Sequence, residues 1–179
     1  KPGETRLDLA QKNTNIFKSI IPQIAQYNAG VLLIVANPVD ILTYAALKLS
    51  EYPMNRVFGS GTALDTARFR YLLSKRCEVD PRNVHAYIIG EHGDTEVPLW
   101  SQVRIGGIPF ADFCRMCNIE CLPEEREEIF EQVKNAAYEI INSKGYTNFA
   151  IALALVRIVS SILRDENSVL TVSTLVDDY

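Results

Sequence analysis

The sequence predicts an α/β fold that starts as a parallel sheet and continues into a part with antiparallel strands. Residues 31–36 form an unbroken β-branched and aliphatic run, which is typical of a strand buried on both faces. Stretches of helical periodicity lie on both sides of this run, and alternation of strand and helix indicates parallel winding. Further along, short strand patterns surround the Gly106-Gly107 turn, which favours antiparallel pairing there.

The expected elements of the first part alternate between helix and strand. They are a helix at 7–28, a strand at 31–36, a helix at 39–49, a strand at 57–59 and a helix at 62–75. Pro22 is expected to bend or break the first helix, and Thr62 to cap the third. Ligands of open α/β sheets bind beyond the carboxyl ends of the strands, so Asn37 and the Gly59-Ser60-Gly61 turn are expected near a site.

The second part predicts a mixture of short strands and two long helices. Its expected elements are a strand at 83–90, two strands within 97–110, helices at 123–144 and 148–163, and a strand at 169–176. No internal repeat or long linker interrupts the chain. We expect further structure of the protein to lie outside residues 1–179 at both ends.

Composition excludes several classes of protein. Apolar residues make up 47% and charged residues 22%, the balance of a soluble globular protein. No run approaches the length of a membrane span, and the first residues lack the pattern of a signal peptide. A net charge of −4 without a basic run argues against nucleic acid as a partner. Four cysteines in 179 residues fit reduced thiols in a cytoplasmic protein.

The spacing of Cys114, Cys117 and Cys121 raises the alternative of a metal or redox site. Structural zinc needs four ligands, and no fourth ligand is evident nearby. On a helix these positions fall near one face, so buried or half-exposed thiols are the favoured interpretation. We predict no metal site.

Four polar residues suit acid/base chemistry on a small anion. Asp65 and Arg68 are three residues apart and share a helix face, although such a pair is often only a surface ion pair. His92 lies in the polar turn Gly90-Glu91-His92-Gly93-Asp94, where it can exchange a proton near neutral pH while Asp65 holds its tautomer. Arg68 can clamp a carboxylate bidentately, and Arg6 in the opening loop can polarise a carbonyl.

Five ordered motifs resemble the L-lactate dehydrogenases, bacterial members especially, of the lactate/malate dehydrogenase family. The motifs are Lys1-Pro2-Gly3-Glu4-Thr5-Arg6, Asn37-Pro38-Val39-Asp40, Asp65-Thr66-Ala67-Arg68, Gly90-Glu91-His92-Gly93-Asp94 and Lys144-Gly145-Tyr146-Thr147. The resemblance covers essentially the whole chain. It implies the end of a Rossmann-type NAD-binding domain over 1–59, followed by an α+β substrate domain over 60–179, and the reduction of pyruvate to lactate by NADH.

The resemblance also implies a role for each site residue. His92 is the expected proton donor and acceptor, Asp65 its partner, Arg68 the carboxylate anchor and Arg6 the mobile carbonyl polariser. Substrate contacts are expected from Asn37, Asp40 and Thr147, and cofactor contacts from Val35, Ala36, Asn37, Ser60 and Ile151. Core packing is the alternative for the aliphatic Val35 and Ile151. Capping of the following helix is the alternative for Asp40.

Bacterial members of the family are often homotetramers activated by fructose 1,6-bisphosphate, and the resemblance assigns this ligand to Arg70 and His85. An arginine and a histidine are good phosphate partners. The alternative for these two is a surface arginine and a strand histidine. If the assignment holds, the activator acts by biasing two states of a subunit interface.

Three other functions stay open at this point. Malate dehydrogenases share several of the motifs but usually carry Met where Glu4 stands. A noncatalytic protein of the same fold is conceivable, although intact Arg6, Asp65, Arg68 and His92 argue against it. An independent nucleotide- or peptide-binding module is the third. No Gly-x-Gly-x-x-Gly loop opens the chain, so we expect residues 1–179 alone to bind NAD poorly.

Overall fold

The computed structural model describes residues 6–27, 30–120 and 122–176, with the side chains of residues 6 and 7 outside the description. The chain divides into two compact units. One comprises Lys1–Gly61 with Val172–Tyr179, and the other comprises Thr62–Thr171. The predicted domains, 1–59 and 60–179, differ from these units chiefly in the last residues, and they stay a prediction. None of the described helices is both long and apolar enough to cross a membrane.

The first unit consists of two parallel strands and two helices. Its elements are α1 (Arg6–Ala25), β1 (Leu32–Ile34), α2 (Val39–Ser50), a 3-10 turn (Met54–Arg56) and β2 (Val57–Gly59). The strands pair in parallel with Leu32 opposite Val57 and Ile34 opposite Gly59. The alternation of buried apolar residues along these elements forms one core, made of Ile21, Ile34, Val39, Leu42, Ala46, Leu47, Tyr52 and Val57. The predicted alternation of helix and strand is thus confirmed.

Pro22 neither ends nor interrupts α1, which continues to Ala25. The helix also begins at Arg6, so this residue is not in a loop. Proline lacks an N–H and removes one helical hydrogen bond, yet the carbonyl of Pro22 still accepts from the N–H of Gln26 at 3.3 Å. The expected break was wrong, because buried Ile21 holds this turn against the core.

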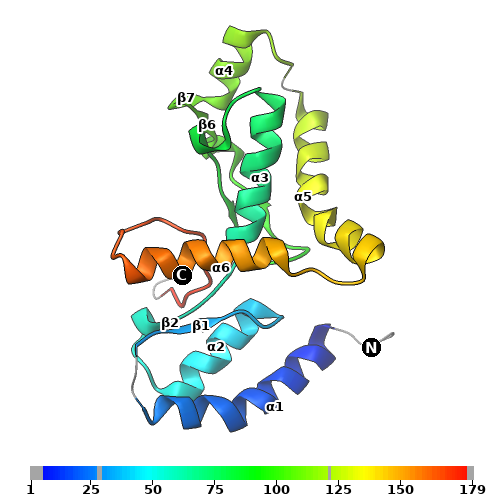
Figure 1. The fold of residues 1–179 in the computed structure, drawn as a ribbon. Helices are drawn as coiled ribbons and strands as arrows, with labels where there is room; N and C mark the ends of the chain where they lie inside the picture. Colours follow the sequence, from blue (N-terminus) through cyan, green and yellow to red (C-terminus); the bar gives the residue numbers. More distant parts are fainter. Residues whose placement is uncertain (1–5, 28–29, 121, 177–179) are drawn as a thin grey trace. The chain divides into compact units, whose positions relative to one another are not determined.

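The second unit is built around α3, with α5 packed beside it (Figure 1). Its helices are α3 (Ala63–Arg76), α4 (Phe110–Cys117), α5 (Pro123–Lys144) and α6 (Phe149–Leu163), with 3-10 turns at Pro81–Asn83 and Trp100–Gln102. The helix at α4 was not predicted. The core comprises Phe69, Leu73, Cys77, Val84, Ala86, Ile88, Val103, Ile105, Phe110, Cys114 and Val133.

The strands of this unit are short and antiparallel. They form a three-stranded sheet of β3 (Val84–His85), β6 (Arg104–Ile105) and β7 (Ile108–Pro109), and a two-stranded sheet of β4 (Ile88–Ile89) and β5 (Val97–Pro98). The hairpin around Gly106-Gly107 is confirmed by the β6–β7 pairing. The single strand expected at 83–90 was wrong, because residues on either side of Ala86-Tyr87 pair with different partners.

The strand expected at 169–176 does not form. Only Ser173 makes a β-bridge, to Gly59, with N···O distances of 2.8 and 3.1 Å. Its β-branched composition favours a strand, but within the described residues no neighbouring segment offers it a continuous ladder. The final apolar run is therefore extended chain with one bridge.

Candidate functional site

Two threonines of α3 fix this helix to β4. Ile88 lies opposite Pro98 of β5. Its N–H donates to Thr66 Oγ1 at 3.0 Å, and its carbonyl accepts from Thr62 Oγ1 at 2.6 Å. Thr62 thus bonds the strand and makes no side-chain cap of α3, so the predicted cap was wrong. Because Ile88 is fully buried, these bonds satisfy backbone groups that have no access to water.

The same linkage sets Asp65 beside the turn that follows β4. Asp65 neighbours Thr66 in α3, and the turn begins at Gly90, whose φ of 87° favours glycine. A Cβ at Gly90 would lie 3.2 Å from the carbonyl oxygen of Thr95. The backbone therefore folds tightly here and carries His92 back towards α3.

Asp65 and His92 form a hydrogen-bonded pair. His92 Nδ1 lies 2.6 Å from Asp65 Oδ2, and the Asp65 side chain is 4% exposed against 29% for His92. A carboxylate accepts hydrogen bonds, so Nδ1 carries the hydrogen and the tautomer is fixed. Residues 27 apart in sequence thus meet as an oriented imidazole on a buried acid.

Arg68 contacts the other oxygen of the same carboxylate. Its Nη1 lies 3.4 Å from Asp65 Oδ1, and its side chain is 16% exposed. The predicted trio of Asp65, Arg68 and His92 is therefore brought together, and the surface ion pair weighed as an alternative is a partly buried one. A guanidinium and an imidazole beside each other can bind an anion and exchange a proton with it.

Glu96, which the sequence reasoning missed, joins this cluster. It is 5% exposed and directly precedes β5. Burial, and then the charge of Asp65, raise the pKa of Glu96 from 4.5 to about 7, while His92 and the Gly93 N–H act in the opposite direction. One ligand-type atom from each of Asp65, His92 and Glu96 lies within 4.8 Å of the others. Such a group of side chains could hold a metal ion, but Arg68 already pairs with Asp65 in it. That the protein has no metal site stays a prediction.

The expected cofactor residues of the first unit follow the ends of the two parallel strands. Val35, Ala36 and Asn37 come directly after β1 and are exposed, with Val35 at 37%. The N–H of Ser60 donates to the carbonyl of Ile34 at 2.8 Å, which holds Ser60 at the end of β1. Core packing, the alternative for Val35, does not agree with this exposure.

Asp40 lies in the first turn of α2, whose N-cap is Pro38. Its Oδ1 accepts a short hydrogen bond from the hydroxyl of Ser173. Pro38, and not Asp40, occupies the N-cap position, so Asp40 is not the N-cap residue of this helix. An acidic side chain in this first turn is nevertheless favourable to the helix dipole.

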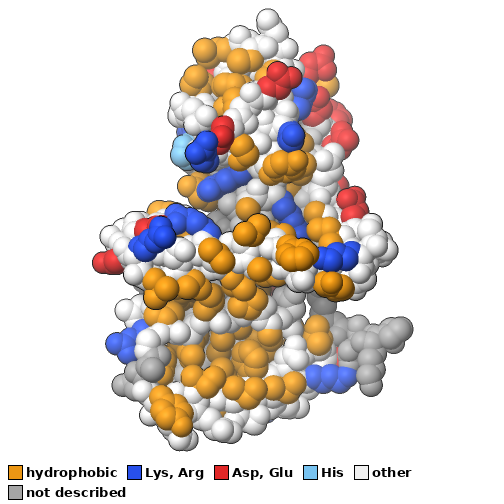
Figure 2. Space-filling view, viewed as in Figure 1, with side chains coloured by type: hydrophobic (Ala, Val, Ile, Leu, Met, Phe, Trp, Pro, Cys, Tyr) orange, Lys and Arg blue, Asp and Glu red, His pale blue; other side chains and the backbone are white. Residues whose placement is uncertain are grey.

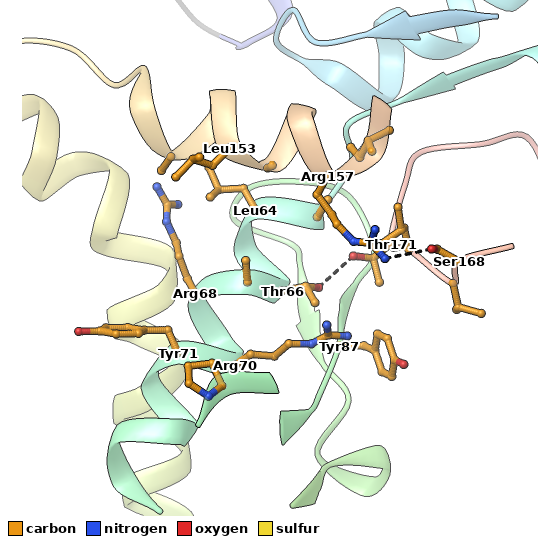
Figure 3. Close-up of a pocket in the computed structure, with 18 of the residues that line it drawn as sticks. Leu64, Thr66, Arg68, Arg70, Tyr71, Tyr87, Leu153, Arg157, Ser168 and Thr171 are labelled. Carbon is orange, nitrogen blue, oxygen red and sulfur yellow. Dashed lines mark hydrogen bonds between the residues drawn. The ribbon is translucent and has the colours of Figure 1, made fainter. Parts of the chain in front are cut away.

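Arg70 and His85 line one pocket of the second unit, with a volume of about 950 Å³. Figure 3 shows Arg70 reaching towards Tyr87; its guanidinium lies 5.0 Å from the centre of that ring, and its Nε donates to the carbonyl of Ala86 at 2.9 Å. The pocket also contains Arg68, Arg82, Arg157 and Ser168. Three of these arginines form ion pairs, with Asp65, Asp80 and Glu166. Arg70 and His85 are therefore the groups of the pocket that suit an anionic ligand.

Arg157 was the second residue missed as part of a site. It interrupts the apolar sequence of α6, and its Nη2 donates to Ser168 Oγ at 3.0 Å (Figure 3). An arginine in an otherwise apolar helix is the signal that marks it. Nothing comparable marks Glu96, because its burial follows from the packing around it.

Within the described part of the chain, the remaining predicted residues make no hydrogen bond or ion pair with the residues of these clusters. Thr147 is exposed between α5 and α6, and Ile151 is half-buried in α6. The side chain of Arg6 lies outside the described residues. Cys114 is buried and Cys117 exposed on α4, so they do not share a buried face, and Cys121 lies outside the described residues. Cys77, Cys114 and Cys117 form no disulfide within the described part of the chain.

Comparison with known proteins identifies the class of enzyme. Residues 1–59 match the NAD binding domain of lactate/malate dehydrogenases, and residues 62–179 match their alpha/beta C-terminal domain. These two matches cover nearly every residue, so the chain belongs to the lactate/malate dehydrogenase family.

Its similar relatives are L-lactate dehydrogenases of bacteria. The chain is 61% identical over 175 residues to that of Thermoanaerobacterium saccharolyticum, covering 97% of this chain and 56% of the relative. It is 60% identical over 179 residues to that of Acetivibrio thermocellus, with 99% and 56% covered. A solved lactate dehydrogenase from a Medee basin deep-sea metagenome library matches with a TM-score of 0.92 and 45% identity, over 98% of this chain and 56% of that one. The chain thus spans about half the length of the relatives it matches.

Proposed function

We propose that the protein is an L-lactate dehydrogenase, which reduces pyruvate with NADH and a proton to L-lactate and NAD⁺, and runs the reverse reaction. The observation that carries the proposal is the Asp65–His92 pair at 2.6 Å with Arg68 on the same carboxylate. The names of the similar bacterial relatives favour pyruvate as substrate.

Each residue of the cluster performs one step on the substrate. Arg68 binds the substrate carboxylate through its planar guanidinium. His92 gives a proton from Nε2 to the keto oxygen as that oxygen becomes a hydroxyl, and takes it back in the reverse direction. Asp65 orients the imidazole through Nδ1 and stabilises its charged form. Arg6 polarises the carbonyl of the substrate, as the family resemblance implies.

The residues after the parallel strands fit an NAD cofactor. Exposed apolar Val35 and the polar Asn37 and Ser60 lie where α/β sheets bind ligands. The family resemblance also assigns Ile151 to the cofactor. When bound, NAD supplies and accepts the hydride. The description of residues 1–59 as an NAD binding domain supports this cofactor.

The substrate distinguishes this proposal from malate dehydrogenase, which the same family includes. The test is NADH oxidation by the full-length protein with pyruvate and, separately, with oxaloacetate at the same concentration. Preference for pyruvate is expected. Preference for oxaloacetate would make the protein a malate dehydrogenase, and no turnover of either would favour a noncatalytic role.

We also infer activation by fructose 1,6-bisphosphate in a cytoplasmic homotetramer. The pocket with Arg70 and His85 supports a phosphate ligand. Phe149, Leu153 and Val156 are 61–71% exposed on α6, which supports subunit contacts there (Figure 2).

The activation has a separate test. Replacing Arg70 by Gln should abolish the activation of pyruvate reduction by fructose 1,6-bisphosphate, whereas Arg115→Gln, at an exposed position of α4, should preserve it. Equal activation of both variants would remove Arg70 from the phosphate site. Size-exclusion chromatography with light scattering tests the tetramer.

A further inference from the structure

We infer that Glu96 is a positioning residue for the acid/base pair: it shares a proton with Asp65 and thereby controls how firmly His92 holds its own proton. The inference rests on the proposed function, since it concerns the proton that His92 exchanges with substrate. It adds a third titrating group to the reaction centre.

Two carboxyl groups lie next to each other in a buried part of the second unit. Asp65 is 3% and Glu96 5% exposed, and an oxygen of one carboxyl group lies within 4.8 Å of an oxygen of the other. Two carboxylates at this distance cannot both hold a negative charge without a large cost, so one keeps a proton. That proton bridges Glu96 and Asp65.

Asp65 is the member of this pair with the closer polar partners. It accepts from His92 Nδ1 at 2.6 Å and lies 3.4 Å from Arg68 Nη1. Glu96 receives a backbone hydrogen bond from Gly93 and the attraction of His92, but burial and the charge of Asp65 outweigh them and raise its pKa. The carboxyl of Glu96 therefore carries the proton and donates it to Asp65.

The charged groups around Glu96 come from three directions. Asp65 faces it from α3, and His92 from the turn after β4. From α5, the charge of Glu96 acts on Lys134, but the Nζ of Lys134 donates to Glu131 Oε1 at 2.6 Å. Because Glu131 of the same helix already neutralises Lys134, the charge of Glu96 acts mainly on the Asp65–His92 pair.

The pKa of Glu96, raised to about 7, lies where a histidine also changes charge. When Glu96 ionises, a second negative charge appears within 4.8 Å of His92 and stabilises the imidazolium. The charge of Glu96 therefore acts directly on the imidazole that exchanges the proton, and a neutral residue at position 96 would remove it.

Glu96→Gln tests this in the full-length protein. Glutamine keeps a donor for Asp65 but cannot ionise, so the alkaline limb of the kcat/KM profile for pyruvate should move to lower pH by about one unit. The control Glu139→Gln alters an exposed residue of α5 and should leave the profile unmoved. A Glu96→Gln limb that coincides with that of the wild type would overturn the inference.

A second measurement needs no turnover. Infrared difference spectra of the wild type between pH 5 and 9 should contain the carbonyl band of a buried carboxylic acid that disappears near neutral pH, and Glu96→Gln should lack it. Its absence from the wild type would also overturn the inference. If the band titrates but the wild type does not reduce pyruvate, the proposed function fails while the shared proton stands, so the two failures are distinguishable.

Discussion

Replacing Thr66 by Val removes the only hydroxyl that accepts from the N–H of Ile88 among the described contacts, at almost unchanged side-chain volume. Ile88 has no exposed surface, so its N–H cannot turn to water. A buried donor left without a partner costs about 1–3 kcal/mol. The Thr66 hydroxyl also lies 2.9 Å from Thr171 Oγ1, and that bond is lost too.

We therefore expect the free energy of opening β4 to fall by about 2 kcal/mol, which corresponds to an approximately 30-fold faster amide exchange. The assay is hydrogen exchange with mass spectrometry on the full-length protein, read in the peptide that spans residues 84–90. Thr66→Ser is the matched control, since it retains the hydroxyl and should exchange much more slowly than Thr66→Val.

A change below twofold in Thr66→Val would refute the reasoning, because it would mean that Ile88 does not depend on α3 for its hydrogen bond. The same variant should lower kcat/KM for pyruvate. Asp65 adjoins Thr66 in α3, and small displacements of an acid/base pair reduce catalysis strongly.

Three further changes probe other parts of the molecule. Glu96→Gln should gain stability relative to the wild type as pH rises from 5 to 8, by up to about 3 kcal/mol: a carboxyl whose pKa rises from 4.5 to about 7 on folding contributes stability that is complete below 4.5 and is lost as pH passes 7. Thermal unfolding at both pH values measures it, and an equal difference at each would contradict it. Gly59→Ala should destabilise the protein by about 1–3 kcal/mol, since the new Cβ would lie 2.3 Å from Thr43 Oγ1; an unchanged melting temperature would count against this. Arg68→Lys should raise KM for pyruvate about tenfold or more through loss of bidentate binding, and steady-state kinetics that match the wild type would exclude the proposed clamp.

The elements with strong local signals were predictable from the sequence. Helix α5 begins at Pro123 and ends at Lys144, and Gly145 follows with a φ of 88° that suits the end of a helix. Proline at the start and glycine after the end can both be recognised in the sequence. The split between β3 and β4 was not predictable, because the two halves of one apolar run pair with strands of two different sheets. The unformed strand at 169–176 failed for the same reason: pairing is decided by neighbours distant in sequence.

The site was predictable in its residues but not in its contacts. Asp65 and His92 carry the right chemistry, yet 27 residues separate them. Tertiary contacts bring α3 against β4, namely the hydrogen bonds of Thr62 and Thr66 with Ile88 and the shared hydrophobic core. Glu96 was missed because a glutamate before a strand is usually solvated. Its role depends on burial, which tertiary packing creates.

The central claim is that His92, held by Asp65, exchanges the proton of a lactate dehydrogenase reaction. The most direct measurement is kcat/KM for pyruvate reduction by full-length His92→Gln against the wild type. Loss of the proton donor should lower it by about 100- to 10,000-fold. A variant within threefold of the wild type would contradict the account and assign proton exchange to another group.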